Sequence, residues 1–424
     1  MSKFKVLFAG LGVIATSAAL TACVDNNATT SSDGTTAAGD AITVSSTADA
    51  CEVATNTTAS GTTTFEIAND GDKTTEFYLL GADGLRIVSE KENIAPGQKA
   101  SMTVSLQPGE YFTACKPGMR GANVGQTAFT VTGDPIELSG EDQELFDAAV
   151  QSYVNFAKNE VEELVPGVEK FAKAYVDGDD ETARKEYAKV RINYERIEPI
   201  AEALGILDPR IDYREIDYLA EADLFKEDDP TFDQWLGFHR IEKDLWVPKK
   251  DKLQPDGTSA YEDWKPSDKA TRKKIGDTLV KDVNKLYDEI HSDNFIEEQQ
   301  LNIASVSNGA AALLEEIAVN KITGEENWWS GYDLWDFQAN LEGSRIAFDL
   351  VAPIVEPKSD EGKKLVAEIE KAFDDLQAEL EKYGNYEDGF KLYDEVSEKE
   401  RKELTAKLDA VREPLAKLTD LTLK

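Results

Sequence analysis

Apolar residues recur every three to four positions through most of the second two-thirds of the chain. A period near 3.6 places such residues on one face of a helix, and long amphipathic helices joined by modest loops are typical of a bundle. The segments with this spacing are residues 164–175, 183–204, 303–319, 334–350 and 365–418. The sequence therefore predicts an all-α helical bundle over residues 138–424. Residues 248–267, rich in Pro, Gly, Lys and Asp, are its longest expected loop.

A different pattern precedes the bundle. Between residues 41 and 133, short runs rich in Thr, Val and aromatic residues alternate with turn sequences such as Asn69-Asp70-Gly71 and Gln107-Pro108-Gly109. Short β-runs at regular spacing, separated by Gly and Pro turns, indicate a small all-β sandwich. The chain is thus predicted to be multidomain, with a β domain before a helical domain.

The first 40 residues match neither pattern. Two lysines precede a largely apolar stretch, which is typical of an export signal over residues 1–22. Leu20-Thr21-Ala22-Cys23 resembles a bacterial lipobox, so we expect lipidated Cys23 at the mature N-terminus; a plain signal with an unrelated Cys is the alternative. Residues 23–40 are small and polar and form a predicted flexible tether. These features predict a cell-envelope protein, either anchored to the outer face of the cytoplasmic membrane or periplasmic.

The composition narrows the possible functions. The 424 residues include 82 Asp and Glu, 46 Lys and Arg, two His and three Cys, with a net charge of −36. So acidic a chain repels phosphate backbones, which excludes nucleic acid as a partner. Two histidines cannot supply a three-His zinc site. Any metal site here must therefore depend mostly on carboxylates.

One histidine lies in a helical pattern with an acid one turn away. Trp235, His239, Glu242 and Trp246 are spaced four, three and four residues apart, so their side chains share one helix face. An imidazole and a carboxylate between two indoles can bind one cation, and this pair suits zinc, iron or copper better than calcium. The alternative is a buried His–Glu hydrogen bond that joins two helices.

The preceding helix carries a ridge of charged residues. Arg191, Glu195, Glu198 and Glu202 each follow an apolar position by one residue. Buried acids are costly unless a cation compensates them, so the ridge is either a solvated face or part of a cation site. The same two interpretations apply to acids further along the chain, Glu315, Glu316 and Glu342.

Several motifs resemble those of imelysin-like proteins, a family also classed as peptidase family M75. Residues 237–242 are similar to the G-x-H-x-x-E motif of that family. The segments that resemble its EfeO-type branch are residues 194–202, 308–311, 321–326 and 333–340. The resemblance covers nearly the whole mature chain. It implies a cupredoxin-like domain at 41–133, an imelysin-like bundle at 138–424, and a role in ferrous-iron uptake.

The same resemblance implies ligands, cargo and partners. It makes His239 and Glu242 metal ligands, completed by carboxylates from other helices. The matching candidates are Glu195, Glu198, Asp256, Glu316 and Glu342. The implied cargo is iron, as Fe²⁺ or Fe³⁺, with Zn²⁺ as the alternative in the helical domain. The implied partners are an EfeU-type iron permease and an EfeB-type haem peroxidase.

Cys51 and Cys115 remain once Cys23 is assigned to the anchor. In an oxidising compartment they form a disulfide between two strands, form a thiolate metal site, or remain free thiols. Residues 41–133 contain no His, and a blue-copper centre needs two, so that type of electron transfer is excluded. In the metal-site alternative, the resemblance makes Glu76 a third ligand for Cu²⁺ or Fe³⁺.

Three functions fit these observations. We favour a lipid-anchored binding protein that captures iron and delivers it to the permease, without enzymatic activity. The second is an M75-type metallopeptidase at His239 and Glu242, but such zinc sites need another nearby His, and residue 243 is Lys while His291 is predicted at a helix surface. The third is cation-dependent binding of an acidic, alginate-like polysaccharide, with Trp328 and Trp329 stacking on sugar rings.

Overall fold

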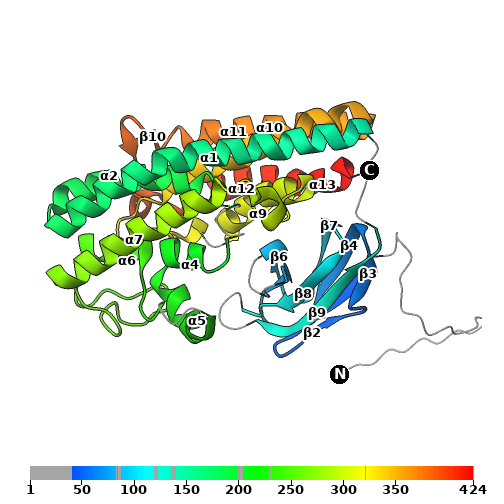
Figure 1. The fold of residues 1–424 in the computed structure, drawn as a ribbon. Coiled ribbons are helices and arrows are strands. Elements are labelled where there is room, and N and C mark those ends of the chain that lie inside the picture. Colours follow the sequence, from blue (N-terminus) through cyan, green and yellow to red (C-terminus); the bar gives the residue numbers. More distant parts are fainter. Residues whose placement is uncertain are drawn as a thin grey trace, which may run out of the picture. The chain divides into compact units, whose positions relative to one another are not determined.

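The computed structural model of the chain describes residues 41–423, except 83, 85–86, 119–122, 135–139, 199, 201–203, 229–231 and 320. The predicted signal peptide at 1–22, Cys23 and the tether at 23–40 lie outside the described residues, as does Glu202. Strands come first and helices follow (Figure 1). This order confirms the predicted fold class, an all-β region before a mostly helical one. None of the described helices is both long and apolar enough to cross a membrane.

Two sheets form the N-terminal sandwich. Their strands are β1 (Ile42–Ser46), β2 (Cys51–Val53), β3 (Thr57–Ala59), β4 (Gly61–Asn69), β5 (Thr75–Leu80), β6 (Ile87–Ile94), β7 (Lys99–Leu106), β8 (Gly109–Cys115) and β9 (Val124–Thr132). The strand orders are β2-β1-β4-β7 and β3-β9-β8-β5-β6. Phe65 packs on Phe77 and Phe129, with ring centroids 5.1 and 5.6 Å apart. These buried rings lie on alternating positions of their strands and fill the space between the sheets.

Cys51 and Cys115 form a disulfide that joins the two sheets. Cys51 lies in β2 and Cys115 in β8, and both are buried. Of the three alternatives for this pair, the structure contains the disulfide. The Glu76 side chain interacts with Tyr78 instead: its buried carboxylate accepts a hydrogen bond from the Tyr78 hydroxyl at 2.5 Å.

Replacing both cysteines, Cys51→Ser with Cys115→Ser, is expected to lower the free energy of unfolding by about 4 kcal/mol. The physical reason is that the bond closes a loop of 64 residues, which restricts the unfolded chain. Urea unfolding of the variant, and of the wild type with and without reductant, measures this. Equal stability of oxidised wild type and variant would contradict it.

The helical region is built from long helices that pack side by side (Figure 1). The helices are α1 (Gly140–Asp177), α2 (Asp180–Glu195), α4 (Leu207–Asp212), α5 (Glu215–Asp228), α6 (Gly237–Leu245), α7 (Lys269–Ile290), α8 (Phe295–Glu298), α9 (Ile303–Val319), α10 (Asp333–Val355), α11 (Asp360–Leu380), α12 (Glu398–Leu415) and α13 (Leu418–Thr422). Short elements between them are η1 (Lys321–Thr323), η2 (Glu356–Lys358), the hairpin β10–β11 (Gly384–Asn385, Gly389–Phe390) and η3 (Tyr393–Glu395). Helix α1 packs on α2 and α7, and α10 packs on α2, α9 and α11. The apolar stripe predicted over residues 164–175 is buried against these neighbours, as a 3.6 period requires.

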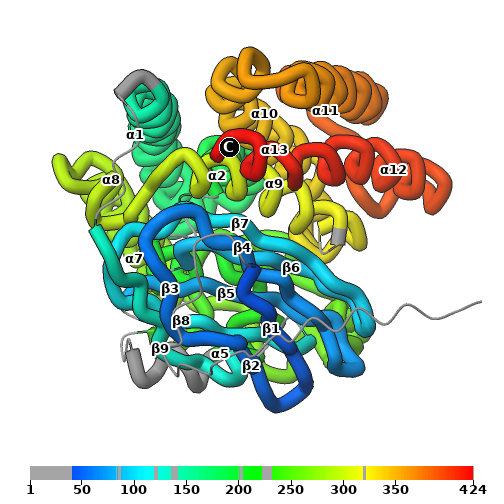
Figure 2. The backbone as a smooth tube through the Cα atoms, turned by 90° about the vertical axis from the view of Figure 1, so that its right-hand side faces the viewer, coloured from blue at the N-terminus to red at the C-terminus, as the bar shows by residue number. Residues whose placement is uncertain are grey.

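Strands β6 and β7 contact helices α9 and α13 (Figure 2). The Asn308 side-chain amide donates to the Thr103 carbonyl at 3.0 Å, and the Thr103 hydroxyl donates to Asp420 at 2.6 Å. Lys91 of β6 forms an ion pair with Glu315 of α9. Polar contacts therefore link the sandwich to the helices.

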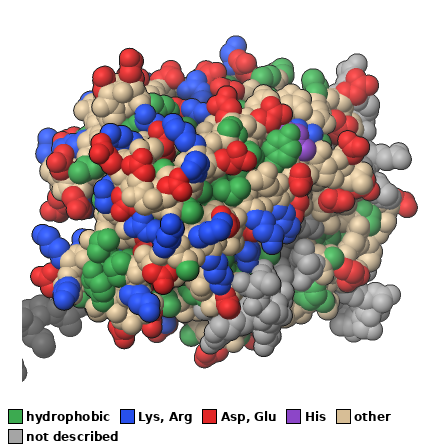
Figure 3. All heavy atoms as spheres, turned by 60° about the vertical axis from the view of Figure 1, so that its left-hand side comes forward, with side chains coloured by type: hydrophobic (Ala, Val, Ile, Leu, Met, Phe, Trp, Pro, Cys, Tyr) green, Lys and Arg blue, Asp and Glu red, His purple; other side chains and the backbone are tan. Residues whose placement is uncertain are grey.

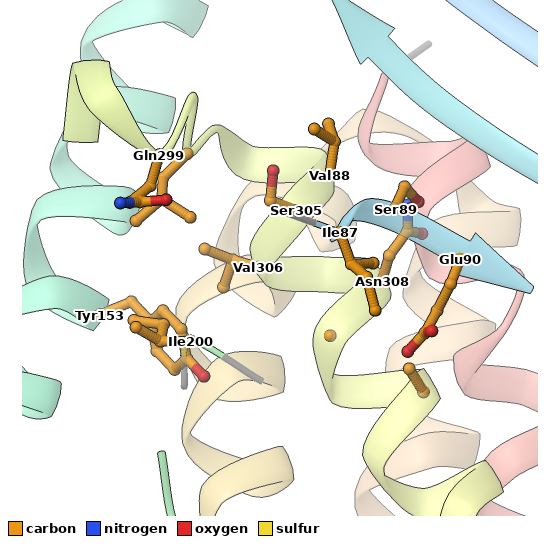
Figure 4. Close-up of a pocket in the computed structure, with 13 residues that line it drawn as sticks. Ile87, Val88, Ser89, Glu90, Tyr153, Ile200, Gln299, Ser305, Val306 and Asn308 are labelled. Carbon is orange, nitrogen blue, oxygen red and sulfur yellow. Dashed lines mark hydrogen bonds between the residues drawn. The ribbon is translucent and has the colours of Figure 1, made fainter. Parts of the chain in front are cut away.

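A cavity of about 60 Å³ lies between β6 and helices α1 and α9 (Figure 4). Its walls include Ile87, Val88, Tyr153 and Val306, and Glu90 contributes a carboxyl group. Burial, followed by the negative charges of neighbouring glutamates, raises the pKa of Glu90 from 4.5 to about 8. Folding thus keeps a proton on Glu90 at neutral pH.

Glu90→Gln is expected to raise the melting temperature at pH 8 and to change it little at pH 5. The unfolded chain loses this proton near pH 4.5, whereas the folded chain keeps it until its pKa of about 8. Ionisation therefore favours unfolding increasingly between these values, by about 2 kcal/mol at pH 8 after screening. Thermal unfolding at both pH values measures the effect, with exposed Glu52→Gln as the control. The same shift at both pH values would contradict the expectation.

Candidate metal centre

Helix α6 carries both His239 and Glu242, and all of its residues are buried. Gly237 begins the helix at φ 87°, and a Cβ atom there would lie 2.1 Å from the carbonyl oxygen of Ile211. Only glycine accepts this φ together with so close an approach. The contact holds α6 against the end of α4, and this places Asp212 beside His239.

The helix is shorter than the predicted stripe of residues 235–246. It begins only after Leu236, which is extended, so Trp235 and Trp246 flank it. Trp246 packs on Tyr187, with ring centroids 5.5 Å apart, whereas Trp235 packs against Arg240 and Lys243. The two indoles therefore do not enclose the His–Glu pair. The aromatic group at His239 is Tyr187, whose hydroxyl lies 3.4 Å from Nδ1.

The His239 ring is 1% exposed and has acids at both nitrogens. Its Nδ1 lies 3.3 Å from Glu242 Oε2, and its Nε2 lies 3.2 Å from Glu326 Oε1 and 3.6 Å from Asp212 Oδ1. Ligand atoms of Asp212, His239 and Glu326 all lie within 4.8 Å of one another. One imidazole and two carboxylates at this spacing are a donor set that iron or zinc accepts.

Glu242 is held in place by the chain segment above it. Its Oε1 accepts hydrogen bonds from the backbone N–H groups of Trp329 and Ser330, at 3.1 and 2.8 Å, and from the Ser330 hydroxyl at 2.8 Å. Its other oxygen faces His239. Glu242 therefore has one oxygen fixed by the protein and one directed to the imidazole.

A second group of acids continues from the first. Ligand atoms of Glu195, Glu326 and Asp336 also lie within 4.8 Å of one another. Fully buried Arg191 forms ion pairs with these three acids and with Asp212. An arginine fork can serve several carboxylates at once, which explains how they remain so close together.

Carboxyl groups outnumber cations in this buried network. The acids are Glu195, Glu198, Asp212, Glu242, Glu316, Glu326, Asp333 and Asp336. Among the described residues, the permanent cations that pair with them are Arg191, Arg214 and Lys321. Buried carboxylates without a counter-charge are costly, so the network is a place where an added cation is stabilised.

Acids on the surface differ from these buried ones. On the face shown in Figure 3, Asp and Glu side chains lie among Lys and Arg side chains, open to solvent. Pairs such as Lys185–Glu181 and Lys402–Glu398 follow the helical i,i+4 spacing. Exposed pairs of this kind contribute little energy. The overall charge of −36 therefore does not by itself mark a site, whereas the buried excess does.

The buried charges shift one another's ionisation. Burial and Arg191 act to lower the pKa of His239, but the nearby acids Asp212, Glu242 and Glu326 raise it to about 10. Burial raises the pKa of Asp333 to about 7, and the Oδ2 atom of Asp333 has no hydrogen-bond partner among the described residues. Without a bound cation, His239 therefore carries a proton at neutral pH, and a metal ligated by its nitrogen displaces that proton.

A cavity of about 20 Å³ lies next to His239 and has room for one ion or one water. His239, Glu242, Glu326 and Gln254 line it. Gln254 is 3% exposed, and its Oε1 has no hydrogen-bond partner within the described part of the chain. An amide oxygen is a metal ligand of the same hard type as a carboxylate, so Gln254 can complete the donor set from the loop between α6 and α7.

Gln254→Leu is expected to weaken Fe²⁺ binding by about tenfold without loss of stability, because it removes an unpaired buried oxygen at nearly constant size. Competition with a chromogenic Fe²⁺ chelator measures the affinity. Gln299→Leu is the matched control, because Gln299 Oε1 is also buried without a partner but lines the separate cavity beside β6. Equal affinities of the two variants would contradict a ligand role for Gln254.

The other predicted site residues fall into two groups, those that belong to the buried network and those that lie outside it. Glu195 and Glu198 lie in the buried network through Lys321, whose Nζ is 3.3 and 2.7 Å from them, and Glu316 lies 3.5 Å from the same Nζ. Asp256 is exposed and accepts hydrogen bonds from Thr258. Glu342 is partly exposed and pairs with Arg196 at 2.7 Å. Neither of these last two acids joins His239.

Sequence reasoning missed four neighbours of the cluster, Asp212, Gln254, Glu326 and Asp336. Glu326 and Asp336 lie inside the segments 321–326 and 333–340 that were singled out as motifs, so a signal for them existed. Asp212 and Gln254 have no periodic or motif signal. The second histidine, His291, lies elsewhere: it stacks on Tyr287 and pairs with Glu162 at 3.3 Å.

Comparisons with known proteins find similarity in both the β region and the helical region of the chain. The sequence model of the imelysin family, peptidase family M75, matches residues 149–418, and that of cupredoxin-like domains matches residues 12–126. The iron uptake system component EfeO of Escherichia coli strain K12 is 35% identical over 375 residues, which are 87% of this chain and 88% of that protein. The EfeO proteins of Escherichia coli O157:H7 and Shigella flexneri have the same identity and coverage. An imelysin-like protein from Psychrobacter arcticum 273-4 of known crystal structure is 13% identical, covering 66% of this chain and 94% of that chain, with a TM-score of 0.42.

Proposed function

Because the chain belongs to the imelysin family and is 35% identical over most of its length to EfeO iron uptake components, we propose that it captures iron outside the cytoplasmic membrane for uptake into the cell. The observation that carries the proposal is the group Asp212, His239 and Glu326, with ligand atoms within 4.8 Å, inside a buried excess of carboxylates. Iron is the cargo here and not a resident cofactor.

The residues of the cluster have different roles in binding the ion. Neutral imidazole is the ligand form of His239, so an arriving cation displaces the proton that Asp212, Glu242 and Glu326 hold on this ring. Carboxylates then neutralise the cation, while Arg191 and Lys321 hold the outer acids at a fixed distance. Iron release follows from the reverse exchange, since protonation of the ring removes a ligand.

Delivery of the iron is the second part of the proposal. Lipidated Cys23 and the tether at 23–40 would keep the folded chain close to the outer face of the membrane, within reach of an EfeU-type permease. An EfeB-type haem peroxidase is the further proposed partner. The relatives are named as components of an iron uptake system, which supports a chain that works with other components.

Metal analysis of the purified mature chain tests the proposal. Anaerobic titration with Fe²⁺, and separate titrations with Fe³⁺, Zn²⁺ and Cu²⁺, are expected to show one high-affinity iron ion for each chain at the His239 cluster. Each Fe²⁺ bound near neutral pH should release at least about one proton, measurable with a pH indicator in weak buffer. A chain that binds neither form of iron at micromolar concentration would remove the proposal. Peptide hydrolysis by the zinc-loaded chain would favour the peptidase alternative instead.

A further inference from the structure

An open groove of about 780 Å³ lies where the loop after α6 meets the segment before α10. Trp246, Trp328 and Trp329 contribute aromatic walls. Two of the described chain's few exposed large apolar residues, Val247 at 51% and Leu392 at 39%, also line it. A third, Leu253 at 52%, borders it, because its carbonyl accepts a hydrogen bond from the Trp328 indole at 3.0 Å. The volume is in the range of small-molecule sites.

Three cationic and two acidic side chains line the groove, although the chain as a whole carries −36. Lys249, Lys252 and Arg184 line it, and the Lys252 ammonium lies 4.6 Å from the centre of the Trp328 ring. In the part of the chain that the structure describes, neither lysine forms an ion pair, even though Asp251 and Asp394 also line the groove. Lysines without acidic partners beside exposed aromatic rings are suited to an anionic ligand.

The groove and the cation cavity share a wall. Trp328 and Trp329 line both the groove and the cavity of about 20 Å³ that contains His239 and Glu242. Ser330, which also lines the groove, donates hydrogen bonds from its hydroxyl and its backbone N–H to Glu242. The cation-binding cavity and the groove therefore have Trp328 and Trp329 as shared lining residues.

We propose that this groove binds an anionic polycarboxylate that carries chelated iron, next to the cavity that takes the ion. The inference rests on the proposed function and adds the form in which the cargo arrives. Such a complex contains the metal cation and carboxylates that the cation does not bind, and each of these finds a complementary site. Lys249, Lys252 and Arg184 pair with free carboxylates, while the tryptophans cover the carbon skeleton. In the transfer, carrier carboxylates leave the ion and Asp212, His239 and Glu326 take their places, without a change in the charge of the ion. A released carrier carboxylate accepts the proton displaced from His239.

Titration of the mature chain with ferric citrate, iron-free citrate and anaerobic Fe²⁺ tests the proposal, read by tryptophan fluorescence and calorimetry. The test variant is Lys249→Glu with Lys252→Glu. The control is Lys363→Glu with Lys364→Glu, two exposed lysines of α11 that make the same change in net charge. We expect the test variant to bind ferric citrate about tenfold more weakly, as loss of close charge pairs predicts, while its Fe²⁺ affinity changes less than about twofold. The control should match the wild type with all three ligands.

The possible outcomes test the carrier groove and the proposed iron-binding function separately. Weak binding of iron-free citrate that the test variant loses supports the groove. An equal effect in both double variants assigns the change to overall charge and overturns the groove, as does unchanged ferric citrate binding in the test variant. Loss of Fe²⁺ binding in His239→Ala, with citrate binding retained, shows that the ion and its carrier occupy different sites. A wild type that binds Fe²⁺ but not ferric citrate overturns this inference and leaves the proposed function standing.

Discussion

His239→Ala is expected to reduce Fe²⁺ affinity by at least about 100-fold, the largest effect of any single substitution in the cluster. The ring is the only nitrogen donor among the described residues of the cluster, and it contacts three acids at its two nitrogens. Its loss leaves carboxylates and amide oxygens alone, a donor set better suited to calcium or magnesium than to iron. The selectivity for Fe²⁺ over Ca²⁺ should therefore fall together with the affinity.

His291→Ala is the matched control because it removes the other histidine of the chain. His291 lies at the end of α7 and contacts Tyr287 and Glu162, outside the cluster. Anaerobic calorimetry on both variants, with thermal unfolding in the absence of metal, separates ligand loss from misfolding. Folded His239→Ala that binds Fe²⁺ like the wild type would exclude His239 as a ligand. Equal losses in both variants would place the site elsewhere.

Arg191→Met is expected to destabilise the metal-free chain by roughly 3–5 kcal/mol, the usual effect of removing one partner from a buried ionic network. Arg191 is fully buried, and its guanidinium pairs with Glu195, Asp212, Glu326 and Asp336. Methionine replaces its volume but not its charge, which leaves these carboxylates facing one another. Bound iron supplies part of the missing positive charge, so added Fe²⁺ should raise the stability of the variant more than that of the wild type.

Urea unfolding with and without Fe²⁺ measures both effects. Arg345→Met is the control, because Arg345 pairs with Asp349 and Asp374 on a partly exposed surface and its loss should cost less than about 1 kcal/mol. Arg191→Lys keeps one charge and covers the case in which Arg191→Met does not fold. Wild-type stability in both Arg191 variants would mean that the guanidinium does not compensate the acids.

The order of domains could be predicted from the sequence because side-chain period is a local property. Short runs rich in Thr, Val and aromatic residues, separated by Gly and Pro turns, predicted the sandwich. A period of 3.6 predicted the bundle, where the apolar stripe of residues 164–175 is buried as expected. His239 and Glu242 could be paired for the same reason, since residues three apart on a helix are neighbours. The helix itself proved shorter than its pattern, because Gly237 must adopt a positive φ to approach α4.

The sequence by itself thus determined the two fold classes, the His239–Glu242 pair and the acidic character of the surroundings. Only the tertiary structure decided which acids reach His239. Glu326 lies 87 residues away along the chain, and Asp212 comes from another helix. Their approach depends on how α4, α6 and the segment before α10 pack, which no local period encodes. The same holds within one loop, where packing turns Gln254 into the cavity and leaves Asp256 exposed. Long-range packing sets the distances between residues that are remote in sequence. It therefore brings these acids together in one buried cluster.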